Sequence, residues 1–521
     1  MENLLNIVDW SRAQFALTAC YHWLFVPLTL GLGLIVAVIE TIYLRTRSDH
    51  WLSVCKFWMR LFGINFAIGV ATGIILEFEF GTNWSNYSWF VGDIFGAPLA
   101  IEGIFAFFME STFFAVMFFG WKKFSPKAHL AATWLTAFGA TLSAWWILVA
   151  NSWMQHPVGM TFSPEEMRNV MTSFSEVALS SVAVNKFLHA VSSGWCLGGI
   201  FVVGVAGWYL LKKRHTQFAI DSIKVGGAVG LVGILVTMAT GHGSAVEVAK
   251  VQPMKLAAME GLYEGQCGQN LVAFGILNPN KKYNDNQEAM LFDISIPYGL
   301  SILGRNDVNA FIPGIKDIID GKDMIDGKPV NTVAYDQRIE RGKAARRALA
   351  DFNDAFSRGD TVAMNAARTA LAADYAYFGY GWLNSPQEAV PNVAMVFYPF
   401  HIMVTLGGWI MLFLMVSLFL VFKKREWLTF SVKNIKVFPL LAIITVPLTY
   451  ICSQCGWIVA EVGRQPWAIQ DIMPLKAAVS SVSSAGVMTT FFIFAILFTI
   501  LLVAELRIIC TQIKKGPESN I

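Results

Sequence analysis

The sequence predicts an all-α polytopic membrane protein with about nine transmembrane helices and a large external hydrophilic loop between the sixth and the seventh. Of its 521 residues, 55% are hydrophobic and only 14% are charged, which is typical of chains that expose apolar side chains to lipid. Apolar runs of about 20 residues recur along the chain, and each is long enough to cross a bilayer. A net charge of +3 without a basic block gives no indication of nucleic-acid binding.

The predicted spans form a group of six and a group of three. We expect three regions: spans one to six in 1–242, a polar insertion in 243–392, and spans seven to nine in 393–521. Within the insertion, 335–380 is expected to form two amphipathic helices broken at 357–360, and a loop of this length is usually functional. The predicted spans are 15–44, 54–80, 95–121, 128–150, 185–211, 220–242, 393–422, 437–460 and 486–510.

Lysine and arginine are distributed unevenly over the short loops. If there are nine spans, every basic cluster lies on the same side of the membrane, and positively charged loops stay on the cytoplasmic side. We therefore expect a multi-pass membrane protein whose N-terminus and insertion are external and whose C-terminus is cytoplasmic. The clusters are Arg45, Arg47, Lys56 and Arg60; Lys122, Lys123 and Lys127; Lys212, Lys213 and Arg214; Lys423, Lys424, Arg425, Lys433 and Lys436; and Arg507, Lys514 and Lys515.

Four possible iron ligands are predicted at one level of the membrane. His22 lies in the first span, His189 opens the fifth, Met403 opens the seventh and Glu461 ends the eighth. Imidazole and thioether groups ligate haem iron, and His/Met ligation suits a haem that transfers electrons. A single intramembrane His or Met is more often a packing residue, and Glu461 with Arg464 is alternatively an ordinary helix-end ion pair.

Two acids lie eight residues apart in the otherwise apolar third span. On an α-helix, Glu102 and Glu110 would lie within about 80° of one face, and carboxyls at that depth can pass protons along with water. Ser143, in the fourth span, is a further candidate for such a chain. The alternative is a pair of structural carboxyls bonded to neighbouring helices. Glu77 and Glu79, near an external helix end, are expected to be merely solvated.

A lysine and a glutamate five residues apart stand at the start of the insertion. Lys255 and Glu260 do not stack on a helix at this spacing, so an ordinary i,i+4 ion pair does not explain them. Near the membrane surface, such a pair could bind and deprotonate a quinol headgroup.

Five runs of residues are distinctive when taken together. They read SRAQFALTACYH at 11–22, FGINFAIGVATG at 62–73, GDIFGAPLAIEG at 92–103, KLAAME at 255–260 and GRQPW at 463–467. In these runs the chain resembles subunit I of the bacterial cytochrome bd quinol oxidases over nearly its full length, and GRQPW at a helix end beside an acid is close to diagnostic. The insertion resembles the long form of that family's quinol loop.

The resemblance implies a subunit of a membrane quinol:oxygen oxidoreductase, a terminal respiratory oxidase. Such an enzyme oxidises quinol, either ubiquinol or menaquinol, at the external face. It reduces O2 to water with cytoplasmic protons and generates a proton motive force without pumping. The implied cofactors are two haems b, one low-spin and one high-spin, and one haem d whose place haem b could take. The implied partners are a second large subunit and small single-span subunits.

The resemblance also implies roles for individual residues. His189 and Met403 match the ligands of the low-spin haem, and His401 is an alternative ligand that faces another way on the helix. His22 and Glu461 match ligands of the two high-spin haems, in an order that the sequence leaves open. The other matches are Glu102 beside the haem d site as a possible iron contact, Glu110 and Ser143 on the proton route, Lys255 and Glu260 in the quinol loop, Trp457 and Arg464 around the high-spin haems, and Arg12 at a haem propionate.

Two other classes of protein are alternatives. A haem–copper oxidase needs about six histidines on its core helices to hold two haem irons and a copper, and too few of the eight histidines here, five, lie in predicted spans. An ion-coupled transporter would explain buried acids and many glycines. It predicts repeated halves with interrupted helices, whereas the sequence shows no internal repeat.

Overall fold

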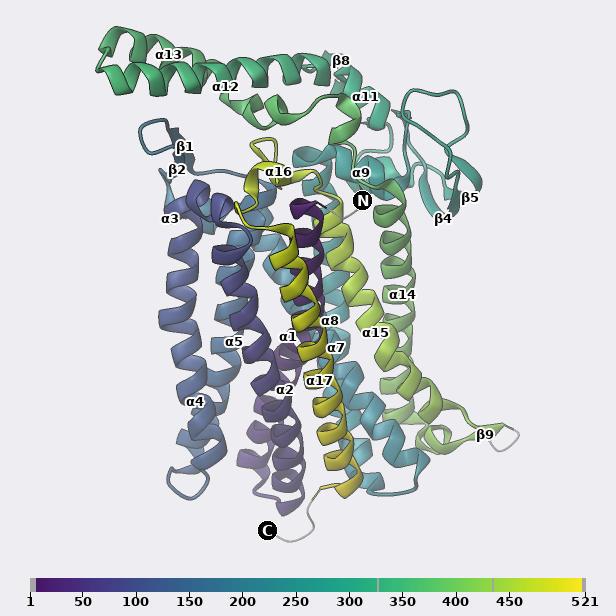
Figure 1. Ribbon diagram of the computed structural model, residues 1–521. Coiled ribbons are helices and arrows are strands. Elements are labelled where there is room, and N and C mark those ends of the chain that lie inside the picture. Colours follow the sequence, from purple (N-terminus) through teal and green to yellow (C-terminus); the bar gives the residue numbers. More distant parts are fainter. Residues whose placement is uncertain (1–5, 326–327, 433–434, 518–521) are drawn as a thin grey trace.

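A bundle of long helices carries the polar insertion across one of its ends (Figure 1). The computed structural model describes residues 6–325, 328–432 and 435–517. Within these ranges, nine helical stretches are long and apolar enough to cross a membrane, which confirms the predicted all-α membrane class. The N-terminal end of the chain lies near the insertion and the C-terminal end lies at the opposite end of the bundle (Figure 1).

All six spans before the insertion begin ahead of the predicted apolar runs, and four of them also end beyond those runs, because the helices continue past the hydrocarbon-length stretch into polar ends. The fifth ends at Leu211 as predicted, and the third ends at Phe119, slightly before the predicted end. A short hairpin, β1 (Met160–Ser163) and β2 (Arg168–Met171), separates the fourth span from the fifth. The helices are α1 (Ile7–Thr46), α2 (Asp49–Thr82), α3 (Ser85–Ile101) continued by the π-helix η1 (Glu102–Phe107) and α4 (Phe108–Phe119), α5 (Pro126–Gln155), α6 (Phe174–Ala178) followed by α7 (Ser181–Leu211), and α8 (Thr216–Val251).

Helix α1 lies inside the bundle and packs against α2, α5, α7 and α17 (Ser484–Lys515). Glycine allows its closest approach: a Cβ placed on Gly31 would lie 2.4 Å from the carbonyl oxygen of Gly194 and 2.7 Å from Cα of Gly198, both on α7. Small residues at such crossings let membrane helices pack backbone to backbone. This contact fixes where His22, on the same helix, stands relative to α7.

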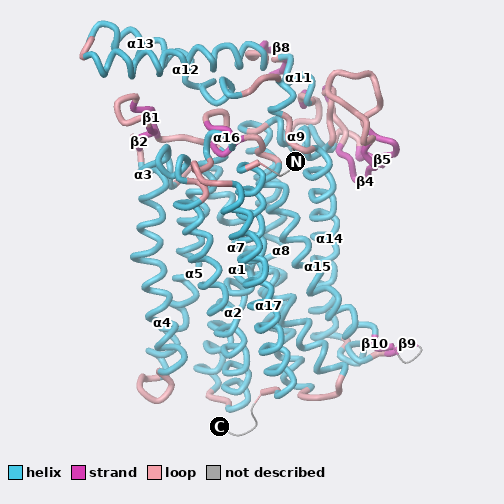
Figure 2. Tube along the Cα trace, viewed as in Figure 1, coloured by secondary structure: helices cyan, strands magenta, loops and turns pink. Residues whose placement is uncertain are grey.

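The insertion contains the two predicted helices and several strands that the sequence did not predict (Figure 2). Helices α12 (Tyr335–Arg358) and α13 (Thr361–Asp374) flank Gly359, as predicted. The strands are two to seven residues long and pair only in twos, so they give little periodic signal. The other elements are α9 (Pro253–Glu260), β3 (Gln266–Cys267), β4 (Leu271–Leu277), β5 (Met290–Ile296), α10 (Gly299–Arg305), β6 (Phe311–Ile312), α11 (Ile315–Asp320), β7 (Lys322–Ile325), β8 (Lys328–Asn331), η2 (Tyr375–Trp382) and η3 (Pro386–Ala389).

Three spans follow the insertion, and the second of them ends at the distinctive GRQPW run. Helix α15 stops at Val462 and the chain then forms a small hairpin whose tip, Asp471, has a positive φ of 61°. The elements are α14 (Val393–Lys423), η4 (Arg425–Thr429), β9 (Ser431–Val432), β10 (Ile435–Lys436), α15 (Val437–Val462), β11 (Trp467–Ile469), β12 (Met473–Pro474), α16 (Leu475–Ala478) and α17.

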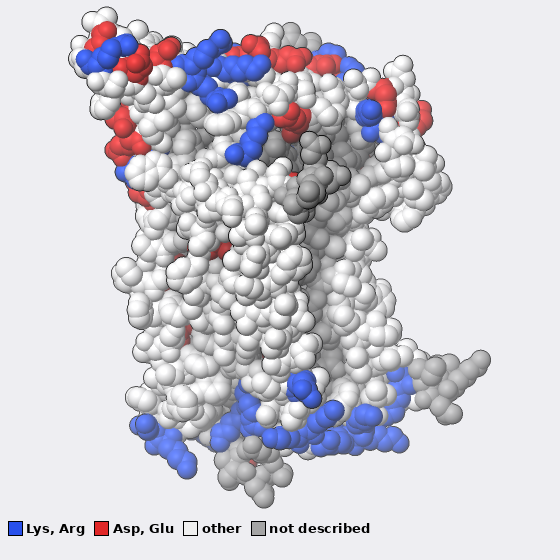
Figure 3. All heavy atoms as spheres, in the orientation of Figure 1, with Lys and Arg blue, Asp and Glu red and all other residues white. Residues whose placement is uncertain are grey.

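Charge is segregated between the two ends of the bundle. On the face seen in Figure 3, Lys and Arg without acids dominate the end opposite the insertion, whereas both signs occur on the insertion. The described basic residues in or just after the last turns of α1, α4, α7, α14 and α17 lie at that end because successive spans run in opposite directions. The structure thus places the described basic loops at one end of the bundle, as nine spans require.

Candidate functional site

A cavity of about 740 Å³ lies among the helices near the insertion end of the bundle. This size is within the range of pockets that hold cofactors or other small molecules. Most of the sequence-predicted site residues border it, although they come from four different spans. The bordering residues are Arg12 and His22 on α1, Glu102 and Glu110 on the third span, Ser143 on α5, Trp457 and Glu461 on α15, and Arg464 just beyond.

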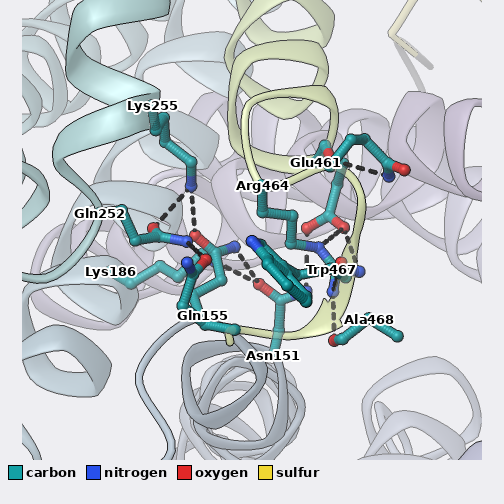
Figure 4. Close-up of polar contacts among 11 residues, drawn as sticks. Asn151, Gln155, Lys186, Gln252, Lys255, Glu461, Arg464, Trp467 and Ala468 are labelled. Carbon is teal, nitrogen blue, oxygen red and sulfur yellow. Dashed lines mark hydrogen bonds and ion pairs between the residues drawn. The ribbon is translucent and has the colours of Figure 1, made fainter. Parts of the chain in front are cut away.

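Glu461 stands at one side of the cavity among cationic and amide groups (Figure 4). Its Oε2 lies 2.7 Å from Nη2 and 2.8 Å from Nε of Arg464, and its Oε1 accepts a hydrogen bond of 3.1 Å from Asn151 Nδ2. Lys186 donates from the other side to Asn151 Oδ1. Because these donors are fixed before any ligand arrives, the carboxylate is held ionised and in one orientation.

Arg464 is itself held by the turn that follows α15. The guanidinium is 6% exposed and its Nη1 donates to the carbonyl oxygens of Ala468 at 2.5 Å and Trp467 at 3.3 Å (Figure 4). The GRQPW run therefore folds the backbone back so that its own carbonyls orient the arginine. Trp457 packs edge-on against Trp23 at 5.0 Å, and the Lys186 ammonium lies 5.8 Å from the Trp457 ring.

Lys255 reaches the same region from α9, outside the spans. It is 3% exposed, and its Nζ donates to Gln155 Oε1 at 2.7 Å and to Gln252 Oε1 at 2.8 Å (Figure 4). Gly463 makes room for it, because a Cβ there would lie 2.8 Å from Lys255 Cγ. Burial, together with the positive charge of Lys186, holds the pKa of Lys255 well below its usual range.

Glu260 lies on the same short helix as Lys255, but its carboxylate has different partners. Its Oε2 accepts a 3.1 Å bond from the backbone N–H of Val272 in β4, whereas its Oε1 is buried with no hydrogen-bond partner among the described residues. Burial raises the pKa of Glu260 to about 8. The structure therefore does not bring the two head groups together: α9 directs Lys255 toward Glu461 and Glu260 toward β4.

His22 faces the cavity from α1. Its Nδ1 lies 3.0 Å from Thr72 Oγ1, which leaves Nε2 without a hydrogen-bond partner among the described residues. A Cβ on Gly73 would lie 3.0 Å from Cε1 of the imidazole, so only glycine accommodates this orientation of the ring. The site thus presents a ring nitrogen that is free to bind a ligand.

The two acids of the third span border the cavity without a cationic partner. Glu102 accepts a 2.6 Å bond from Ser143 Oγ, and Glu110 packs where Gly139 of α5 leaves space, since a Cβ there would lie 3.0 Å from Glu110 Cβ. The expected angle of about 80° assumed a regular α-helix, but η1 is a π-helix. A π-helical turn contains about one residue more than an α-helical turn. The eight-residue spacing across η1 is therefore equivalent to seven residues on an α-helix, which places Glu102 and Glu110 within about 20° of each other around the helix axis.

The expectation that Glu77 and Glu79 are merely solvated is wrong for Glu79, whereas Glu77 is exposed. Helix α2 continues to Thr82, so these residues lie inside its last turns. Glu79 is 1% exposed and accepts a hydrogen bond from Thr18 of α1, and Glu77 borders the cavity. The positions of acids near the end of a helix do not by themselves show which face of that helix packs against its neighbours.

His189 and Met403 occupy a separate place, since neither borders the cavity. His189 Nδ1 lies 3.2 Å from Thr240 Oγ1, which leaves its Nε2 available. Met403 Sδ lies 3.2 Å from the Cβ position of Gly456 on α15. One turn further along α14, Gly407 and Gly408 have no atom within 4 Å of their Cβ positions, so open space adjoins the methionine.

His401 is tied to the insertion. Its Nδ1 lies 2.8 Å from the carbonyl oxygen of Phe397 and its Nε2 lies 2.8 Å from that of Val272. Because both ring nitrogens point at carbonyl oxygens, neither nitrogen is directed at open space. This geometry favours Met403 over His401 as a ligand.

Sequence reasoning missed the amide residues that join these groups. Asn151, Gln155, Gln252 and Gln470 connect Glu461 to Lys255 and beyond, and Lys186 adds a third cation. The available signal was the pair Asn151 and Gln155, four residues apart at the end of an apolar span.

Comparison with known proteins identifies the family. The family model described as cytochrome bd terminal oxidase subunit I matches residues 10–517. The chain is 39% identical to cytochrome bd-II ubiquinol oxidase subunit 1 of Escherichia coli (strain K12), over 99% of this chain and 98% of that one. It is 32% identical to cytochrome bd ubiquinol oxidase subunit 1 of Bacillus subtilis (strain 168), over 98% and 94%.

The fold agrees with a solved structure, that of the bd oxidase from Geobacillus thermodenitrificans. The TM-score is 0.78 at 23% identity, and the match covers 98% of this chain and 99% of the other. These findings exclude the haem–copper oxidase and transporter alternatives. The chain belongs to the cytochrome bd terminal oxidase subunit I family.

Proposed function

We propose that this chain is the haem-bearing subunit of a membrane quinol oxidase that takes electrons from quinol at the insertion side and protons for water from the opposite side. Family membership makes it a multi-pass inner-membrane subunit of a terminal oxidase with haem cofactors and a second subunit as partner. The observation that carries the proposal is the cavity, where iron-binding, proton-carrying and cationic groups from four spans converge.

The groups around the cavity fit a haem. Arg464 pairs with Glu461 on one side, and Lys186 bonds to Asn151 on the other side of the same carboxylate. Because two cations stand beside one carboxylate, an anionic ligand would compensate the remaining buried positive charge. A haem carries two carboxylates and would supply the redox chemistry at which oxygen is reduced. We assign His22 and Glu461 to two high-spin haems, where each side chain would ligate one iron. Arg12, Trp457 and Arg464 stand around them, and Glu102 borders the cavity in which oxygen would be reduced.

His189 and Met403 are the proposed ligands of a low-spin haem b. The free Nε2 of His189, the thioether of Met403 and the open space at Gly407 and Gly408 support this assignment. Together with one high-spin haem b and one haem d, this gives three haems. Haem b at the haem d position is the alternative that a spectrum would decide.

Protons are proposed to reach the cavity along the third span. Glu110, Glu102 and Ser143 all border the cavity, and the 2.6 Å hydrogen bond that Ser143 donates to Glu102 joins two of them. Buried carboxyls without cationic partners can take up and release protons. The charge asymmetry in Figure 3 supports a cytoplasmic source, because the basic end lies opposite the insertion.

Quinol is proposed to be oxidised where α9 meets β4. The free Oε1 of Glu260 is placed to accept a proton from a quinol hydroxyl, and Lys255 on the same helix bonds to Gln155 of α5 on the side of Glu461 (Figure 4). Relatives are named as ubiquinol oxidases, and one that is 24% identical is named as a putative menaquinol oxidase, so quinol is assigned only as a class.

Further partners are proposed from the apolar surface. Helices α4 and α17 expose many large apolar side chains in the chain by itself, among them Phe108, Phe119, Ile496 and Ile500. The second subunit, small single-span subunits and lipid would cover these faces.

The direct test is the visible absorption of the complex purified from membranes, with and without Met403→Leu. We expect bands of low-spin haem b, high-spin haem b and the red-shifted haem d in the wild type. Leucine keeps the volume of methionine at a packing cost below about 1.5 kcal/mol, so the variant should fold but lose the low-spin signal or change its redox potential. An unchanged low-spin signal would overturn the assignment of Met403.

A further inference from the structure

A line of hydrogen bonds connects the insertion to Lys255. It begins at Arg338 on α12, whose Nη1 donates to Tyr380 Oη at 3.0 Å, and Tyr380 in turn donates to Asp471 Oδ1 at 2.9 Å. Gln470 Nε2 donates to the same Asp471 oxygen at 2.9 Å, and its Oε1 accepts from Gln252 Nε2 at 2.9 Å.

The last member of the line holds the lysine. Gln252 uses its amide nitrogen for Gln470, which turns its Oε1 toward Lys255 Nζ at 2.8 Å. An amide that donates to one partner must present its oxygen in the other direction. The orientation of Gln252, and with it one of the two acceptors of Lys255, therefore depends on Gln470 and on Asp471.

The insertion fixes Asp471 firmly. Tyr380 is 1% exposed and packs against Trp467 at 4.9 Å, and the Arg338 guanidinium lies 4.8 Å from the Tyr335 ring and 5.5 Å from the Tyr380 ring. The backbone closes the same contact, since the N–H of Gly379 donates to the carbonyl oxygen of Asp471 at 3.1 Å. The outer helices thus dock on the hairpin tip that follows GRQPW.

We propose that Asp471, held by Tyr380 and Arg338, is a positioning residue for Lys255, so that docking of the insertion sets the charge arrangement beside Glu461. This inference rests on the proposed function, because it assumes that Lys255 serves turnover. The residues of the line touch neither substrate nor cofactor: they act through Gln470 and Gln252. The outer part of the insertion would in this way adjust the site beside Glu461.

Two substitutions at Asp471 separate acceptor geometry from other roles. Asn and Gly both tolerate the φ of 61° at this position. Asp471→Asn keeps an oxygen that accepts from Tyr380 and Gln470 and should retain more than half of wild-type kcat. Asp471→Gly removes the acceptor and should lower kcat about fivefold, with a quinol KM within about twofold of wild type. If Asp471→Asn lost as much activity as Asp471→Gly, that result would overturn the positioning role of Asp471.

Arg338→Gln tests the far end of the line, and Arg341→Gln is its matched control. Arg341 also lies on α12, where it pairs with Asp374 at 2.6 Å and lies 4.4 Å from the Tyr377 ring, but these contacts stay inside the insertion. We expect kcat to fall about threefold in Arg338→Gln and to stay unchanged in the control. Equal behaviour of the two variants would overturn the inference.

A double-mutant cycle that combines Arg338→Gln with Lys255→Gln separates a failure of this inference from a failure of the proposed function. In the Lys255→Gln background, Arg338→Gln should change kcat by less than about 1.5-fold, because the group that it positions is gone. Additive losses would place the role of Arg338 elsewhere and overturn the inference alone. Wild-type turnover in Lys255→Gln itself would instead overturn the proposed role of Lys255 and the inference with it. The haem spectrum of each purified complex checks that the site is assembled.

Discussion

The cavity brings together two kinds of buried carboxyl group. Glu461 is surrounded by donors: Arg464 at 2.7 Å, the amide of Asn151 and, through that amide, Lys186. Glu102 and Glu110 border the same cavity, yet Glu102 has only the hydroxyl of Ser143 at 2.6 Å, and neither acid forms an ion pair within the described ranges.

This difference teaches what each kind of carboxyl group can do. An ionised carboxylate in hydrocarbon is costly unless cations and hydrogen bonds compensate it. Glu461 has that compensation in advance, so it is suited to a permanent charge, such as a ligand of iron. The third-span acids lack it, so they are stable in the neutral form and suited to carry a proton in transit. Glu260, with a bond from Val272 and a free oxygen, belongs to the second kind.

The largest effect is expected from Glu461→Ala, which removes the carboxylate that cations and hydrogen bonds compensate. The high-spin haem that Glu461 would ligate should be lost, while the low-spin haem assigned to His189 and Met403 stays reducible by quinol. The cations left unpaired should destabilise the protein by about 3–5 kcal/mol. Absorption spectra of the purified complex measure the first effect and thermal unfolding measures the second.

Glu461→Asp sharpens this test, because it keeps the charge but draws the carboxylate back by one methylene. We expect a perturbed high-spin band with little loss of stability. If Glu461 only forms a helix-end ion pair, the alanine variant costs about 0–1 kcal/mol and both variants show the wild-type spectrum, which would refute the assignment of Glu461 as a ligand.

Glu110→Gln tests the other kind of carboxyl group. Glutamine keeps the shape and most of the hydrogen bonding but cannot carry a proton, so oxygen consumption should fall about 100-fold with all haem bands intact and carbon monoxide still bound. Glu505→Gln is the matched control, because Glu505 is also a buried acid in a span, 3% exposed, but lies away from the cavity. Normal turnover of Glu110→Gln would eliminate the relay, and lost haem would indicate a structural acid.

The pH dependence of quinol oxidation tests Glu260. Burial raises its pKa to about 8, and a carboxyl accepts a proton only when it is ionised. The rate of low-spin haem reduction by quinol should therefore rise with pH up to about 8 and then level off. Glu260→Gln should lower this rate about tenfold and abolish the rise. A rise that persists in the variant would assign the proton acceptor to another group.

The smallest effect is expected from Ser143→Ala. The hydroxyl donates one 2.6 Å bond to Glu102, and losing a bond to a buried group costs about 1–2 kcal/mol. Oxygen consumption at saturating quinol should fall about threefold, without loss of haem. Turnover equal to that of the wild type would mean that Glu102 is positioned without Ser143.

The sequence alone predicted the membrane class, the number of spans and eight of the residues that border the cavity. Long apolar runs identify spans because hydrocarbon tolerates few charges, and for the same reason His22, Glu102, Glu110 and Glu461 were conspicuous. The amphipathic pattern also predicted α12 and α13. Family-specific runs such as GRQPW supplied the roles that residue types left open.

Only the tertiary structure decided which of these groups meet. The separation of Lys255 from Glu260, the burial of Glu79 and the π-helical turn at Glu102 depend on neighbouring helices. The same holds for the amides between Lys255 and Glu461, because a glutamine in a loop or at a helix end gives no periodic signal and gains its meaning from partners far away in the chain. Hydrophobicity is a property of each segment and can be read locally, whereas hydrogen bonding is a property of pairs and appears only when the pairs are folded together.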